Sequence, residues 1–84
     1  MAEGQEPDFA EQLAGLDLGL FLASAGSTIA GLVYAKLERR DLAQAKLGIE
    51  ALTVLLPLLE GDAKRDLEAA LTSLQVAYAD AVSA

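Results

Sequence analysis

Side chains that could carry out catalysis are few in this chain of 84 residues. It contains no histidine and no cysteine, so the usual zinc and copper ligands and two of the commonest catalytic groups are missing. Carboxylates alone could hold magnesium or calcium, which is a weaker case. The hydroxyls of one apolar stretch have no base nearby in sequence: Ser24, Ser27 and Thr28. We therefore predict that the protein is not an enzyme, with no catalytic residue, no metal site and no cofactor.

A group of acids follows the last glycine of the chain: Asp62, Asp66 and Glu68. Acids are expected near a helix start, where they cap free N–H groups and favour the positive end of the helix dipole. The two tyrosines, Tyr34 and Tyr78, fall at helical spacing with apolar residues. We interpret them as aromatics at the edge of the core whose hydroxyls reach water or a carbonyl, rather than as ligand-stacking residues.

The basic residues that could bind an anion are Lys36, Arg39, Arg40 and Lys46. They lie next to Asp41, which we expect to open a helix whose free N–H groups face the same turn. Alternatively, these charges compensate a helix end and pair with acids, as Lys46 and Glu50 could do at four-residue spacing. The second interpretation is favoured, so an anion-binding regulator remains a weaker alternative for function.

The net charge is −7, and the acidity is concentrated at the N-terminal end of the chain. The first 17 residues contain no Lys or Arg and carry five acids: Glu3, Glu6, Asp8, Glu11 and Asp17. Such a chain is repelled by nucleic acid and by anionic lipid. The start also lacks the basic region of a secretory signal peptide. We expect a cytoplasmic protein that binds no nucleic acid.

Length and composition favour a small helical domain that associates with itself. A chain of this size buries only roughly 60–65% of its unfolded surface. Without cysteine or histidine, oligomerisation is the remaining way to stabilise it. The apolar residues make up 54% of the chain and are mostly Ala and Leu, which favour helix over strand.

Periodicity and capping residues predict helices at about 17–38, 41–56 and 63–82, in one domain covering 17–84 after an acidic, partly disordered arm at 1–16. The expected N-caps are Asp17, Asp41 with Gln44 at the capping-box position, and Asp62. Asp8 could cap a weak first turn. Pro57 should end the second helix near residues 55–56, and Gly61 should stop it. The predicted fold is all-α, an antiparallel three-helix bundle or hairpin that assembles into a homo-oligomeric helical bundle.

The first of these helices is apolar on more than one face, and no charge occurs between Leu18 and Ala35. Such a helix must be buried on several sides. We predict that it forms the oligomer interface through Leu18, Leu22, Ala25, Gly26, Ile29, Ala30, Leu32 and Val33. The alternative is a transmembrane span, since 18 residues is just long enough. The hydroxyl side chains of this stretch and the amphipathic stripe of the third helix favour the soluble interpretation over membrane contact.

Several segments together resemble a known family. They are Phe21-Leu22-Ala23-Ser24, then Asp41-Leu42, Ala45-Lys46, Ile49-Glu50 and Leu52, and finally Leu71, Leu74 and Tyr78. In this order they are similar to domain of unknown function 1844, a family of short bacterial proteins, over residues 18–80. This sequence departs from the family pattern in two ways. The turn Glu60-Gly61-Asp62 is shorter than the family's turn, and Pro57 stands where the family's helix would continue. The resemblance implies a helical, bacterial protein and no defined activity.

The sequence thus predicts a non-enzymatic helical protein that acts as a self-associating interaction or structural module. Its expected partner is itself, as a homodimer or larger assembly, and it could also dock another protein. The main alternative is a small membrane-attached protein with residues 18–37 inserted in lipid.

Overall fold

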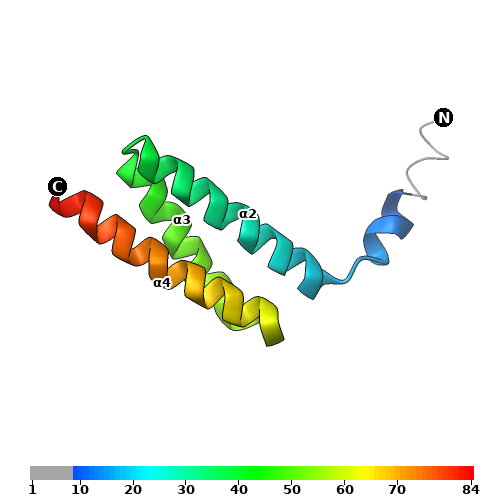
Figure 1. Cartoon of the computed structure of the whole chain (residues 1–84). Coiled ribbons are helices and arrows are strands. Elements are labelled where there is room, and N and C mark those ends of the chain that lie inside the picture. The colour runs from blue at the N-terminus through cyan, green and yellow to red at the C-terminus, as the bar shows by residue number, and fades with distance from the viewer. Residues whose placement is uncertain (1–8) are drawn as a thin grey trace.

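The computed structural model describes residues 9–84, which are almost entirely helical (Figure 1). A short helical segment at 9–14 precedes α2 (Leu18–Glu38), α3 (Leu42–Leu55) and α4 (Gly61–Ser83). The 3-10 turn η1 (Leu56–Leu58) separates α3 from α4. No strand occurs between residues 9 and 84. The prediction of an all-α chain is confirmed. The cap predicted at Asp8 and residues 1–8 of the arm, which is predicted to be partly disordered, lie outside the described residues.

The three long helices lie side by side, each in contact with the other two. α3 runs back along α2, and α4 returns in the direction of α2 (Figure 1). Segment 9–14 projects beyond the end of the molecule at which α2 begins (Figure 1). Short connections force neighbouring helices to be antiparallel.

Two aspartates cap helices as predicted. The carboxylate of Asp17 accepts a hydrogen bond from the Leu20 N–H at 3.2 Å, and that of Asp41 accepts from the Gln44 N–H at 3.3 Å. The capping box of α3 is only half formed. The backbone N–H of Asp41 donates to the Lys36 carbonyl at 2.9 Å, because the end of α2 uses it to close its last turn.

The junction of α3 and α4 corrects one prediction. Pro57 lies in η1, so α3 ends at Leu55 as expected. The N-cap of α4 is Glu60, not Asp62, and its side chain makes no capping bond. Asp62 instead lies in the first turn, where it pairs with Arg65 at 3.5 Å. Gly61 adopts a positive φ of 65° and already belongs to α4, so the helix begins before Asp62 is reached.

The core is small and wholly apolar. Its buried members are Ala30, Val33, Ala45, Leu52, Leu59, Leu67, Leu71 and Leu74. α3 and α4 supply five of these, and Leu59 lies between η1 and α4. Gly48 allows α3 to approach α2 closely, because a Cβ there would overlap Val33 Cγ2. The described residues contain no buried polar or charged side chain.

Candidate interaction surface

α2 leaves most of its apolar surface uncovered. It buries Gly26, Ala30 and Val33, whereas Leu18 is 68% exposed and Leu20 is 72% exposed. By length and composition the helix could cross a membrane, with a mean hydropathy of 1.6 and only 17% of its most apolar window buried. A core helix of a soluble protein would be mostly buried. Contiguous exposed apolar surface is typical of interaction sites.

The eight residues predicted as an oligomer interface divide into three groups. Gly26, Ala30 and Val33 are buried inside the chain, where they pack α2 against α3 and α4. They cannot contact a partner unless the fold opens. Leu22, Ala25 and Ile29 are half-buried, while Leu18 and Leu32 are exposed. The surface of α2 available to a partner therefore excludes Gly26, Ala30 and Val33. The part that remains includes Ile29 and Leu32, which border α3.

A groove of about 200 Å³ runs between α2 and α3. Its walls include Ile29, Leu32 and Lys36 from α2, and Gln44, Leu47 and Ala51 from α3. No residue of α4 lines it, so this side of the α2–α3 pair is open. Leu47 is 58% exposed and was missed by the sequence reasoning. The sequence does contain a signal for it. Leu47, Ala51 and Val54 recur at helical spacing, and they form a second apolar stripe on α3, apart from the one that faces the core.

A second exposed apolar surface lies where segment 9–14 meets the start of α2. Leu13 and Leu16 line a hollow of about 350 Å³ together with Leu18 and Phe21. Phe9 and Leu13 are four residues apart and share one side of the helical segment, and Leu16 follows in the bend before α2. All three are exposed. Among residues 9–84, nothing covers these three apolar side chains.

A second groove, between α2 and α4, has a different lining. It has a volume of about 510 Å³ and is walled mainly by small residues and hydroxyls, including Ser24, Ser27, Gly31 and Ala70. Tyr34 also lines it and is exposed, whereas Tyr78 is half-buried against the core. Asp66 is the one acid in its lining, so no pair of carboxylates is available there for acid–base chemistry.

The Thr28 hydroxyl donates to the Ser24 carbonyl at 3.1 Å, within the turns of α2. The acidic side chains also give no sign of a metal site in the described part of the chain. Across residues 9–84, no group of three or more acids comes together to hold a metal ion.

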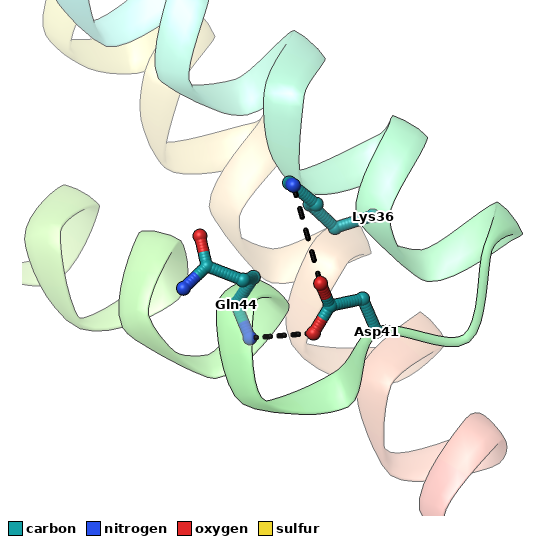
Figure 2. Close-up of polar contacts among 3 residues, drawn as sticks. All are labelled: Lys36, Asp41 and Gln44. Carbon is teal, nitrogen blue, oxygen red and sulfur yellow. Dashed lines mark hydrogen bonds and ion pairs between the residues drawn. The ribbon is translucent and has the colours of Figure 1, made fainter.

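The basic turn after α2 is held by contacts within the chain. Lys36 lies 4.0 Å from Asp41, whose carboxylate also accepts from the Gln44 N–H (Figure 2). Asp41 thus takes the place that a bound anion would need at this helix start. The guanidinium of Arg40 donates to the Ala81 carbonyl at 3.2 Å, which ties the turn to α4.

The other two bases of the cluster remain open to solvent. Arg39 and Lys46 are exposed. The expected pair of Lys46 with Glu50 is not formed, since the ion pairs of residues 9–84 are Lys36–Asp41 and Asp62–Arg65. An exposed pair four residues apart gains only a few tenths of a kcal/mol, about as much as it loses in side-chain entropy.

In comparisons with known proteins, no family model, no curated protein and no solved structure matches this chain. The resemblance to domain of unknown function 1844 therefore rests only on the residues given above.

Proposed function

We propose that this protein is a non-enzymatic interaction module that works by binding a second copy of itself through the open side of α2 and α3. The assembly is a homo-oligomeric helical bundle, a dimer at least, in the cytoplasm. The observation that supports this proposal is the exposure of α2. Its uncharged stretch from Leu18 to Ala35 remains largely solvent-exposed although α3 and α4 both pack against it.

Self-association is the simplest way to cover this surface. A twofold interface is self-complementary, so the same groove on two copies can be covered without another gene product. A specific interface needs roughly 800 Å² from each partner. Leu32 and Leu47 line the groove, and Leu18 falls on nearly the same side of α2 as Leu32 by helical periodicity. All three side chains are exposed and can contribute to this area.

A second candidate is a membrane-attached protein with α2 inserted in lipid, which the length and hydropathy of α2 favour. The packing of the chain argues against it. α2 contributes Ala30 and Val33 to the core, and Gly48 of α3 closes directly on Val33. Moving α2 into lipid would uncover Leu52 and Leu74, which are fully buried. That exposure would cost several kcal/mol, at about 1.5–3 kcal/mol for each buried leucine.

The first prediction tests self-association with Leu32→Glu. Leu32 is 55% exposed in the single chain, so a charge there should leave the fold intact. In the assembly it would place an unpaired carboxylate in the interface, which is costly. We expect sedimentation equilibrium to give an oligomer for the unmodified protein and a folded monomer for the variant, with unchanged helical circular dichroism.

Val76→Glu is the matched control, because Val76 is 58% exposed on α4. It should keep the oligomer. A mass of 8.7 kDa for the unmodified protein at micromolar concentration would contradict the proposal. Recovery of the protein only with detergent would favour the membrane-attached alternative. Ile29→Glu is a poorer probe, because Ile29 also packs against the core.

A further inference from the structure

The exposed apolar surface at the start of α2 is separate from the α2–α3 groove. We call it the N-terminal patch, and its members are Phe9, Leu13, Leu16, Leu18 and Phe21, each more than half exposed. All of them except Phe9 wall the hollow of about 350 Å³. Within residues 9–84, no residue of α3 or α4 lines that hollow. Segment 9–14 projects beyond the three long helices (Figure 1), so the patch is open to a partner.

The end of the molecule that carries this patch is acidic. Residues 1–35 contain five acids and no Lys or Arg. Two of these acids, Glu11 and Asp17, are exposed and lie between members of the patch in the sequence. α4 begins at the same end (Figure 1), and there Lys64 and Arg65 are outnumbered by four acids: Glu60, Asp62, Asp66 and Glu68. A partner therefore meets large apolar side chains accompanied by negative charge.

A second copy of the chain does not match the charge of the patch. Beyond residue 35 the six bases are accompanied by eight acids. In the turn after α2, Lys36 lies 4.0 Å from Asp41, and the guanidinium of Arg40 donates to the Ala81 carbonyl. Across residues 36–84, every base lies within a few residues of an acid. The described chain thus offers no strongly positive surface to receive the patch of another copy.

A lipid surface does not match it either. Segments that lie in the membrane interface are typically rich in Lys and Arg, which anionic headgroups attract. Residues 1–35 have neither of these side chains, and their acids are repelled by the same headgroups. The matching partner is therefore one that brings positive charge together with apolar side chains.

We propose that the N-terminal patch binds a segment of another protein that combines large apolar side chains with Lys or Arg. An apolar side chain of the partner enters the hollow between Leu13, Leu16 and Phe21, and its bases lie opposite Glu11 and Asp17. The buried apolar contact supplies most of the affinity, while the complementary charges select the partner. The patch shares only Leu18 with the surface proposed for self-association, so this inference does not depend on that proposal.

The chemistry of the partner is tested with synthetic peptides of about 14 residues, or four turns of helix. One peptide repeats Leu and Lys at helical spacing. A second has Glu in place of every Lys, and a third has Ala in place of every Leu. Fluorescence anisotropy with the full chain should show that the second and third bind at least about tenfold more weakly than the first. Equal binding of the Leu–Glu peptide, or no binding of the Leu–Lys peptide, would overturn the inference.

The position of the site is tested with Leu16→Gln, which removes a large apolar side chain from the hollow. It should weaken binding of the Leu–Lys peptide about tenfold or more and leave the melting temperature unchanged. Val76→Gln is the matched control, because Leu16 and Val76 are both 58% exposed. It should change the affinity less than about twofold. Equal losses in the two variants would place the peptide elsewhere on the molecule and overturn the inference.

The role of charge is tested with Glu11→Gln. This variant should weaken binding about threefold, as expected for the loss of an exposed ion pair. Glu38→Gln is the control, since Glu38 is exposed at the opposite end of α2, and it should change the affinity less than about twofold. An unchanged affinity for Glu11→Gln would contradict the proposed pairing of the partner's bases with the patch.

Two measurements distinguish the competing occupants. If a second copy covered the patch, Leu16→Gln would dissociate the oligomer in sedimentation equilibrium. If lipid covered it, the unmodified protein would sediment with vesicles of phosphatidylcholine and phosphatidylglycerol, and Leu16→Gln would not. Either result would overturn the inference. An unmodified protein that is monomeric and still binds the Leu–Lys peptide through Leu16 would contradict self-association alone and leave this inference standing.

Discussion

Arg40 has a backbone φ of 59°, in the left-handed region that costs a residue with a Cβ roughly 1–2 kcal/mol. Its N–H donates to the Leu37 carbonyl at 3.0 Å, while the next N–H, that of Asp41, reaches the Lys36 carbonyl. Glycine is the usual residue at this position of a helix end. Here the bond from the arginine side chain to the Ala81 carbonyl partly offsets the strain.

We predict that Arg40→Val destabilises the protein by about 2 kcal/mol, because a β-branched residue is least compatible with positive φ. Arg39→Val is the matched control, since Arg39 has an ordinary φ of −86° and is exposed. It should change the free energy of unfolding by less than about 0.5 kcal/mol. Urea unfolding followed by circular dichroism measures both. Equal losses in the two variants would show that the backbone conformation is not the cause.

At the scale of helices, glycine has opposite effects in α2 and α3. Gly31 lies within α2, and a Cβ there would meet no atom within 4 Å. Gly48 lies within α3, and its missing side chain is what lets Val33 close on that helix. Both positions carry the same entropic cost relative to alanine, roughly 0.5–1 kcal/mol. Only the tertiary contact distinguishes them.

Gly31→Ala should therefore stabilise the protein by about 0.5–1 kcal/mol, whereas Gly48→Ala should destabilise it by about 1–3 kcal/mol through overpacking against Val33. Thermal melts of the two variants under one buffer condition provide the comparison. Gly31 lies outside the groove proposed as the interface, so its variant should also keep the dimer dissociation constant. A destabilised Gly31→Ala protein would mean that another part of the assembly packs against this position.

At the scale of the whole molecule, α4 covers only one side of the α2–α3 pair. Within residues 9–84 the buried core has eight members. Several large apolar side chains remain outside it, including Phe9, Phe21 and Leu20. A core of this size provides little stability by itself. Folding and self-association should therefore be thermodynamically linked.

We accordingly predict that the melting temperature falls on dilution, by roughly 4 °C for each tenfold decrease in concentration. The monomeric Leu32→Glu variant should melt at a lower temperature that does not depend on concentration. Differential scanning calorimetry over a hundredfold range tests this. A constant melting temperature for the unmodified oligomer would show that its subunits are stable alone.

Local interactions made much of this fold predictable. The helices were located from apolar periodicity, the caps at Asp17 and Asp41 from side chains that reach backbone N–H groups three residues away, and the end of α3 from Pro57. Each depends on atoms separated by a few residues, so the sequence alone determines it. The failure at Asp62 was also local, because Gly61 entered the helix one residue before it.

Only the tertiary structure decided which side of α2 faces its own chain. The stretch Leu18–Ala35 has no charge on any side, so its periodicity could not separate Val33, which is buried, from Leu32, which is exposed. The difference arises where Gly48 of α3 leaves room for Val33, a contact between residues far apart in the chain. The sequence of a helix that is apolar on all sides indicates that the helix must be buried. Which side contacts which neighbouring helix is determined by the complementary shapes of the packed side chains.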